Sequence, residues 1–263
     1  MKEAMETRIS QAILDAYHAK LRRALRSDAL IVGAGPSGLV AAYRLAESGY
    51  RVVIIEKRLS PGGGIWGGAL GMNEVALEAN ALAILDELGV AHRGGEGLYT
   101  ADAAELAGAL CAKAIAAGAT YLNLMTAEDL CVREDRVTGV VVNRTMLGES
   151  LPIDPFVLAS GAVIDATGHE AALVACLARR NLLKNRQTFA GEGPMDAPAG
   201  EQFVVNEVAE IFPGLWITGM SVCAALGGPR MGPIFGGMLL SGAEVANRVA
   251  KNLERREREA NSS

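Results

Sequence analysis

A glycine motif placed between two apolar segments constrains the fold of this chain more than any other feature. Residues 29–32 (ALIV) form a short apolar run, and the segment 33–38 (GAGPSG) follows it directly. A stretch with helical spacing, residues 39–48, and a second apolar run, residues 51–55, come next. Short, continuous apolar runs are typical of buried parallel strands. The sequence therefore predicts a β-α-β unit of about 30 residues.

Each glycine of the motif has a separate physical role in a dinucleotide site. Gly33 allows the tight turn, Gly35 lets a pyrophosphate approach the backbone, and Gly38 lets helix and strand pack closely. The N-terminus of the following helix offers free N–H groups to the phosphates. Glu56 ends the second strand, where a carboxylate can accept both ribose hydroxyls and repel a 2′-phosphate. We therefore expect NAD or FAD rather than NADP, although Lys57 and Arg58 weaken this preference. The alternative is a tight turn that binds no nucleotide.

Composition and charge exclude several functional classes. The net charge is −5 and no basic stripe with interleaved aromatic residues is present, so we expect no nucleic-acid partner. No apolar run reaches the roughly 18 residues that a membrane span needs, and residues 1–14 do not read as a signal peptide. The four cysteines form no CxxC pair. They are typical of reduced thiols, and we expect a cytoplasmic protein.

The alternation of apolar runs and helical stretches predicts an α/β, Rossmann-like FAD/NAD(P)-binding fold with a mainly parallel sheet. We interpret residues 1–263 as a single dinucleotide-binding domain, with an N-terminal helix (1–27), a core (28–250) and a charged C-terminal tail (251–263). A β-hairpin is expected at 132–142. We further expect helices at 74–88, 101–117 and from 244 on, and strands at 120–124, 162–165 and 215–218.

Two further segments resemble elements of the large FAD/NAD-binding family. Residues 163–168 (VIDATG) resemble its strand that returns beside the nucleotide, and residues 215–219 (LWITG) resemble its C-terminal motif. That motif ordinarily continues with an aspartate that holds the flavin side of the cofactor, and this chain has Met220 instead. Because methionine cannot do that task, and because 263 residues leave little room for a substrate domain, flavin is disfavoured.

Three segments together resemble one family, the thiamine thiazole synthases. They are residues 60–68 (SPGGGIWGG), Asp154-Pro155 ahead of Thr167-Gly168-His169, and residues 228–236 (GPRMGPIFG). The similarity extends from the N-terminal helix to about Ala250. It implies an enzyme of the pentosyltransferase class that consumes NAD. Nicotinamide leaves, and the ADP-ribose part is joined to glycine and sulfur. The implied product is the ADP-thiazole adenosine diphospho-5-(2-hydroxyethyl)-4-methylthiazole-2-carboxylate. The resemblance further implies Fe(II) and a homo-octamer.

The resemblance also implies roles for individual residues. Asp154 and His169 match the family's iron ligands, which come from neighbouring subunits, and Arg230 matches the residue that holds the glycine carboxylate. A carboxylate and an imidazole suit Fe(II), and a guanidinium can grip a carboxylate with two bonds. From the residues alone, Asp154 could instead mark a turn, His169 a polar strand end and Arg230 a surface charge. The positions that match the family's NAD contacts are Ser37, Glu56, Lys57, Gly64, Ala127 and Met220.

The source of sulfur is decided by position 152. In self-sacrificing members of the family a cysteine two residues before the Asp-Pro gives up its sulfur, and archaeal sulfide-using members have histidine there. This chain has Pro152, which has no nucleophile. We therefore expect a sulfide-dependent enzyme that turns over repeatedly. Cys223, the cysteine nearest to a site segment, is interpreted as core packing.

Three alternative functions remain open at this point. A flavin-dependent oxidoreductase of the same fold would be yellow when purified. A ribose 1,5-bisphosphate isomerase, an activity ascribed to some archaeal relatives, would turn over its substrate without iron. A non-catalytic NAD-binding module would keep its only property, NAD binding, when His169 is replaced by alanine.

Overall fold

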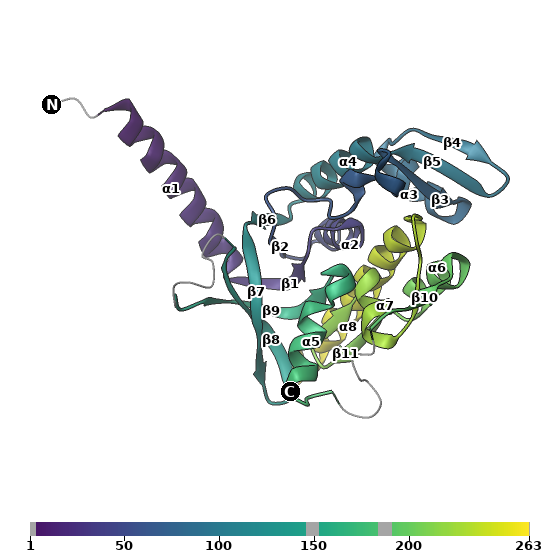
Figure 1. Cartoon of the computed structure of the whole chain (residues 1–263). Coiled ribbons are helices and arrows are strands. Elements are labelled where there is room, and N and C mark those ends of the chain that lie inside the picture. Colours follow the sequence, from purple (N-terminus) through teal and green to yellow (C-terminus); the bar gives the residue numbers. More distant parts are fainter. Residues whose placement is uncertain (1–3, 146–152, 184–190, 263) are drawn as a thin grey trace.

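A computed structural model gives the fold and describes residues 4–145, 153–183 and 191–262. Its centre is a mainly parallel sheet, as the sequence predicts (Figure 1). The central strands run in the order β12–β9–β1–β2–β6 and each is parallel to its neighbours, while β11 pairs antiparallel with β12 at one edge. These strands are β1 (Arg26–Val32), β2 (Val52–Glu56), β6 (Thr120–Asn123), β9 (Phe156–Asp165), β11 (Ala209–Phe212) and β12 (Leu215–Ile217).

The register of the parallel strands brings their carboxyl ends to one edge of the sheet. Val32 of β1 pairs with Ile55 of β2 on one side and with Asp165 of β9 on the other. Asp165 in turn lies opposite Ile217 of β12. The segments that follow these four strands therefore emerge side by side, which is where ligands bind in open α/β sheets.

The predicted β-α-β unit is present, with α2 (Pro36–Glu47) between β1 and β2. Gly35 is the N-cap residue of α2 and Pro36 occupies its first turn, where the missing N–H costs nothing. Helix α2 packs against α4 (Ala103–Ala116) and α8 (Gly236–Asn261). A Cβ at Gly242 would lie 2.4 Å from the Ser37 carbonyl oxygen, so glycine is what lets α8 cross α2 at backbone contact.

The predicted hairpin is confirmed and is longer than expected. Strands β7 (Met125–Arg133) and β8 (Arg136–Arg144) pair antiparallel around a turn at Glu134 and Asp135. Strand β8 continues the sheet by pairing antiparallel with the first half of β9.

The expected helix at 74–88 is wrong in its first part. Residues Glu74–Glu78 form β3, and only Leu82–Leu88 form the helix α3. Val75 and Leu77 are fully buried while their neighbours are not, so this run has the period of a strand. Pairing with β5 (Leu98–Asp102) decides the structure, because that partner is distant in sequence. Together with β4 (His92–Gly95), β3 and β5 make a second, three-stranded sheet.

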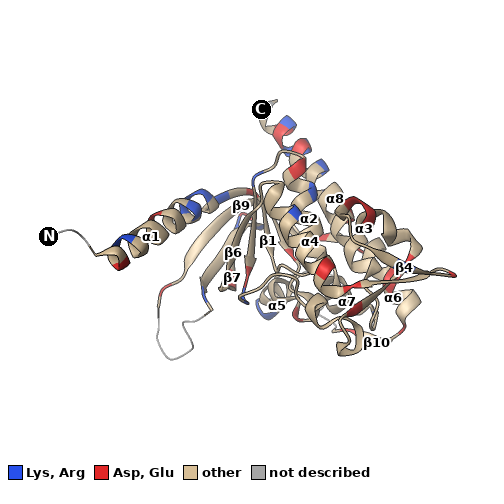
Figure 2. Cartoon of the chain, turned by 90° about the horizontal axis from the view of Figure 1, so that it is seen from above, with Lys and Arg blue, Asp and Glu red and all other residues tan. Residues whose placement is uncertain are grey.

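The other helical expectations hold with changed boundaries. The N-terminal helix is α1 (Met5–Ala24), which projects away from the rest of the chain (Figure 1), and the helix at 101–117 is α4. The charged tail is no separate unit, because residues 251–261 continue α8, whose charged end is visible in Figure 2. Within the described ranges no helix is long and apolar enough to span a membrane. Besides β4, β5 and β11, the sequence pattern did not indicate α5 (Ala172–Arg179), β10 (Gly193–Met195), α6 (Ala197–Asn206), α7 (Met220–Leu226) and β13 (Pro229–Arg230).

Candidate active site

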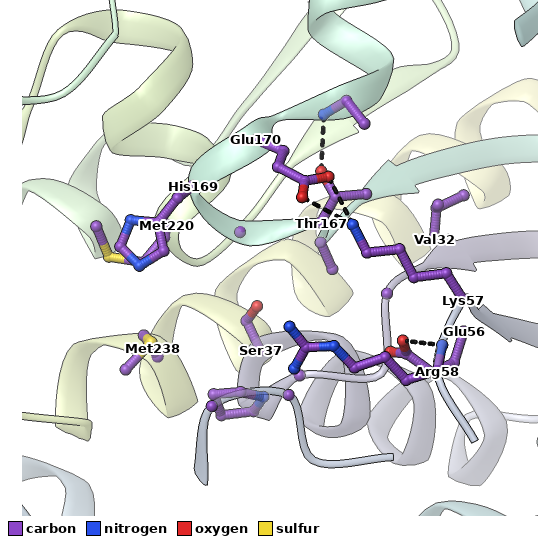
Figure 3. Close-up of a pocket in the computed structure, with 18 of the residues that line it drawn as sticks. Val32, Ser37, Glu56, Lys57, Arg58, Thr167, His169, Glu170, Met220 and Met238 are labelled. Carbon is purple, nitrogen blue, oxygen red and sulfur yellow. Dashed lines mark hydrogen bonds and ion pairs between the residues drawn. The ribbon is translucent and has the colours of Figure 1, made fainter. Parts of the chain in front are cut away.

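A cavity of about 620 Å³ opens at the carboxyl edge of the parallel sheet, and Figure 3 shows part of its lining. This volume lies within the usual range for ligand pockets. The segments after β1, β2 and β9 reach it from the sheet, and residues from β7, α7, β13 and the start of α8 complete it. Ten of the twelve residues singled out in the sequence line this cavity: Gly33, Gly35, Ser37, Glu56, Lys57, Gly64, Ala127, His169, Met220 and Arg230.

Packing requires glycine at two positions of the motif, Gly33 and Gly38, but not at the third, Gly35. At Gly33, where φ is +103°, an added Cβ would lie 2.4 Å from the Ala166 carbonyl oxygen. At Gly38 it would lie 2.1 Å from the Gly33 carbonyl oxygen, and Gly38 does not line the cavity. At Gly35 an added Cβ would meet nothing within 4 Å, and φ is an ordinary −75°. Gly35 thus leaves space that the fold does not use, at the N-terminus of α2, where N–H groups can receive a phosphate.

The glycine-dense loop after β2 forms another wall of the cavity. Gly62 donates its N–H to the Ala34 carbonyl oxygen at 2.6 Å. At Gly63, where φ is +57°, an added Cβ would approach the Gly35 Cα to 3.1 Å. Gly64 lines the cavity and has nothing within 4 Å of an added Cβ. The loop therefore closes onto the motif and leaves Gly64 facing open space.

Glu56 is a buried carboxylate held from two sides. Its Oε2 accepts the N–H of Ala34 at 2.9 Å, and its Oε1 accepts the N–H of Arg58 at 2.8 Å. The side chain is only 6% exposed, yet it borders the cavity. An ionised carboxylate has about four acceptor sites, so each oxygen keeps capacity for a hydroxyl donor. The arrangement suits recognition of a ribose.

Lys57 and Glu170 form an ion pair at the cavity wall (Figure 3). The Lys57 Nζ lies 2.7 and 2.8 Å from the two carboxylate oxygens of Glu170. Lys57 follows β2, whereas Glu170 belongs to the short 3-10 helix η4 (Gly168–Glu170) after β9. The lysine that the sequence assigns to NAD binding is therefore already neutralised by a carboxylate.

Asp165, fully buried at the end of β9, organises the turn that presents His169. Its Oδ1 accepts the N–H and hydroxyl of Thr167 and the Ser221 hydroxyl, and its Oδ2 accepts the N–H groups of Leu173 and Val174. Burial raises the pKa of Asp165, and the hydrogen bonds from Thr167 oppose that rise. Five donors on one carboxylate fix the path of residues 165–174, and with it the position of η4.

Five methionines contribute sulfur and apolar surface to the cavity lining. Met220 follows Gly219, where φ is +61° and an added Cβ would lie 2.3 Å from the Ser37 Oγ. Gly219 therefore lets the start of α7 approach α2 and carries Met220 to the cavity (Figure 3). The other methionines in the lining are Met125, Met195, Met231 and Met238.

His169 and Arg230 both contact the carboxylate of Glu192. The Nδ1 of His169 pairs with Oε1 of Glu192, and the Nε of Arg230 lies 3.3 Å from Oε2. Both contacting side chains are more than half exposed at the cavity, whereas that of Glu192 is 12% exposed and is not part of the lining. The structure thus brings together the predicted metal ligand and the predicted carboxylate-binding residue.

Comparison with known proteins identifies the family. Residues 10–235 match the Thi4 family. The chain belongs to the Thi4 family. It is 48% identical over 250 residues to a thiamine thiazole synthase of Thermococcus kodakarensis, covering 94% of this chain and 98% of that protein. It is 47% identical over 248 residues to the thiamine thiazole synthase of Thermotoga maritima, covering 93% and 97%. The crystal structure of THI4 from Thermovibrio ammonificans superposes with a TM-score of 0.92 at 44% identity, covering 97% of this chain and 100% of that one.

Asp154, the second metal ligand that resemblance to the Thi4 family implies, lies outside the cavity in this chain. It is exposed and precedes β9 at the far end of that strand from His169. Across the parts of the chain that the structure describes, no three His, Cys, Asp or Glu side chains gather as a metal site. Pro152, the residue at the donor-cysteine position, falls outside the described residues.

No cysteine lines the cavity of this Thi4 protein, and all four are free thiols. Cys223 is fully buried, as the interpretation of core packing requires. Burial raises the pKa of all four thiols, that of Cys223 to about 11. Each is therefore held as the thiol rather than as the nucleophilic thiolate.

Sequence reasoning missed Glu170 and Glu192 as partners of site residues. Glu170 follows the segment 163–168 closely, which indicates that it lies near the site. Nothing in the sequence indicates that it pairs with Lys57. Glu192 lies in no sequence motif, and only the folded structure brings it into contact with His169 and Arg230. The sequence indicates Asp165 as the end of a strand, but three of its five hydrogen bonds arise only when α5 and α7 close over it.

Proposed function

We propose that this chain synthesises the ADP-thiazole precursor of thiamine from NAD, glycine and sulfide, with Fe(II), and releases nicotinamide. The proposal rests on a single observation. One cavity is lined both by the glycine motif with Glu56, here called its floor, and by the imidazole of His169 and the guanidinium of Arg230. Membership of a family whose relatives are named thiamine thiazole synthases supports the same reaction.

The floor of the cavity suits the ADP-ribose part of NAD. The open space at Gly35 and the N-terminus of α2 would take the pyrophosphate, and the Glu56 carboxylate would accept the hydroxyls of the adenosine ribose. Glu170 offsets the positive charge of Lys57, which leaves Arg58 as the unpaired cation among the lining residues that follow β2. The Glu56 carboxylate and the Lys57–Glu170 pair support NAD over NADP.

Arg230 would hold the glycine carboxylate. Its contact to Glu192 uses Nε, which leaves the two terminal nitrogens of the guanidinium to face a ligand. Arg230 and His169 share Glu192 as a partner, so a glycine held by Arg230 lies close to the imidazole.

The residues present fit an iron site that two copies of the chain complete. His169 has Nδ1 paired with a carboxylate, which leaves Nε2 as the nitrogen for a metal. Since Asp154 is exposed and outside the cavity, we propose that a second copy supplies this ligand. Fe(II), when bound, supplies Lewis-acid activation of the substrate.

External sulfide is the proposed sulfur source. No cysteine borders the cavity, and burial raises the pKa of every thiol, so none is poised to give up its sulfur. Intact-mass measurement before and after many turnovers should show an unchanged chain. Loss of about 34 Da, as in conversion of cysteine to dehydroalanine, would refute the sulfide-dependent proposal.

A homo-octamer is the proposed assembly. Helix α1 projects from the body (Figure 2). It exposes Met5, Ile9, Ile13 and Leu14, while Tyr17 and Leu21 further along pack on the core. An exposed apolar stripe of this kind favours burial against another copy.

Anaerobic incubation with Fe(II), NAD, glycine and sulfide tests the activity. We expect release of nicotinamide and an adenylated thiazole carboxylate, detected by mass spectrometry, and dependence on each of the four components. Inert protein that is yellow with bound flavin would instead support an oxidoreductase. Turnover of ribose 1,5-bisphosphate without iron would support an isomerase. NAD binding with no turnover of any kind would support a binding module.

A further inference from the structure

Glu192 contacts both His169 and Arg230, the two side chains to which the proposed function assigns metal and glycine binding. Its Oε1 pairs with the Nδ1 of His169 and its Oε2 lies 3.3 Å from the Nε of Arg230. The Glu192 side chain is 12% exposed and does not line the cavity, so any effect on a ligand passes through its partners.

The backbone around Glu192 is held firmly in place. Gly191 donates its N–H to the Ala224 carbonyl oxygen of α7 at 3.0 Å, and Gly193 donates to that of Gly228 at 2.8 Å. Directly after Glu192, β10 pairs in parallel with β13, which contains Arg230. The segment that contains Glu192 is therefore hydrogen-bonded to the strand that contains its partner Arg230.

We propose that Glu192 is a positioning residue that orients His169 for a metal and Arg230 for a carboxylate at the same time. The inference rests on the proposed function and extends it. A carboxylate on Nδ1 fixes the ring so that Nε2 is the free ligand atom, the usual arrangement for a metal-binding histidine. The same carboxylate on Nε of Arg230 turns the terminal nitrogens toward the ligand.

Because one carboxylate serves both groups, their positions are coupled. Removal of Glu192 should loosen the imidazole and the guanidinium together, whereas a purely structural tie would affect stability alone. The two contacts use different oxygens, so Glu192→Gln, which has one oxygen and one amide nitrogen, can reproduce only one acceptor. The amide variant is also the safer test, since it preserves the shape of the side chain.

The experiment uses the full chain and Co(II) as a spectroscopic probe for the metal. Wild type, Glu192→Ala, Glu192→Gln and His169→Ala are titrated with Co(II), and the KM values for glycine and NAD are measured with Fe(II). We expect Co(II) binding about 10- to 100-fold weaker in Glu192→Ala. A glycine KM raised about tenfold, or roughly 1.4 kcal/mol, is expected with the NAD KM unchanged. Glu192→Gln should preserve one of the two properties better than the other.

Glu244→Gln is the matched control. Glu244 pairs with the Nε of Arg248 one turn along α8 and does not line the cavity, so this variant also removes one carboxylate–arginine pair. It should leave Co(II) binding and both KM values as in wild type. Melting temperatures of all variants separate positioning from loss of fold.

The possible outcomes separate this inference from the proposed function. Co(II) affinity and glycine KM within twofold of wild type in Glu192→Ala would overturn the positioning role, whatever its melting temperature. A second outcome is that His169→Ala and Glu192→Ala both weaken Co(II) binding while the wild-type protein forms no thiazole product. This result would refute the proposed function and support the role of Glu192 in orienting the metal ligand. Wild-type protein that binds no Co(II) through His169 would overturn both.

Discussion

The ammonium group of Lys57 lies between the two carboxylate oxygens of Glu170, at 2.7 and 2.8 Å, and so joins the end of β2 to the segment that carries His169. The two side chains are 46% and 62% exposed, so the pair contributes little to stability. Its effect is on charge. A lysine that faces a dinucleotide cavity is partnered within the chain and is not left for a phosphate.

Glu170→Gln should therefore relax the preference for NAD over NADP. We expect the released Lys57 to attract a 2′-phosphate and to raise the affinity for NADP relative to NAD by about tenfold, or roughly 1.4 kcal/mol. The free energy of unfolding should change by less than about 1 kcal/mol. Competitive binding of the two dinucleotides, with unfolding followed in parallel, measures both. An unchanged NADP-to-NAD ratio would show that the ion pair has no role in selection.

Gly35→Ala should weaken dinucleotide binding without loss of the fold. An added Cβ has free space and an ordinary φ of −75° at this position, so the strain is small, but the methyl group enters the space proposed for pyrophosphate. We expect at least about a tenfold weaker NAD affinity with a nearly unchanged melting temperature.

Gly38→Ala is the contrasting variant for that test. Its Cβ would lie 2.1 Å from the Gly33 carbonyl oxygen, so helix and strand must move apart and the protein should be destabilised by several kcal/mol. If Gly35→Ala bound NAD as wild type does, the pyrophosphate would not lie at this loop.

Asp165→Asn should destabilise the turn that presents His169. An amide has only one acceptor oxygen, so its nitrogen would face donors that Asp165 now satisfies. A buried donor without an acceptor costs about 1–3 kcal/mol, and we expect a loss of about 3 kcal/mol in denaturant unfolding. A variant as stable as wild type would mean that the five hydrogen bonds contribute nothing net.

Glu201 should make the protein less stable as the pH rises from about 4.5 to about 7. Burial raises the pKa of this carboxyl, which is 4% exposed, to about 7, against an opposing hydrogen bond from Gly237. Between the unfolded pKa, near 4.5, and the folded one, the native state binds more protons than the unfolded state, so stability falls as the pH increases.

Glu201→Gln tests this pH dependence. The neutral amide removes the cost of burying a charge, so the variant should gain up to about 3 kcal/mol over wild type at pH 8 and little at pH 4. Urea unfolding of both proteins at several pH values provides the measurement. Parallel stability profiles would contradict the raised pKa.

The exposed stripe of α1 should mediate assembly. In the double variant Ile9→Glu and Ile13→Glu, two side chains that are 51% and 63% exposed become charged, which a monomer tolerates and an apolar interface does not. We expect dissociation of the oligomer by light scattering with chromatography, together with retained helical content. A wild-type chain that is monomeric would refute the octamer, and an unchanged oligomer in the variant would place its interface elsewhere.

Local patterns were sufficient for the elements whose signals are carried by neighbouring residues. The β-α-β unit with its glycine motif, the hairpin around Asp135 and the helix α4 follow from apolar periodicity and turn residues. The run at 74–78 was misjudged because a short stretch of mixed apolar and charged residues fits both periods. Its pairing with β5, whose residues lie at least 20 positions further along the chain, decides between them.

By itself the sequence determined the nucleotide fold, the glycine-lined floor with Glu56 at its end, and the resemblance that selects His169 and Arg230, because each of these depends on residue types at fixed spacing. Only the tertiary structure decided what those side chains contact. Lys57 pairs with a residue 113 positions away, and Glu192 joins His169 to Arg230 across separate elements. Such contacts depend on how strands and helices close over one another, and no local spacing encodes that closure.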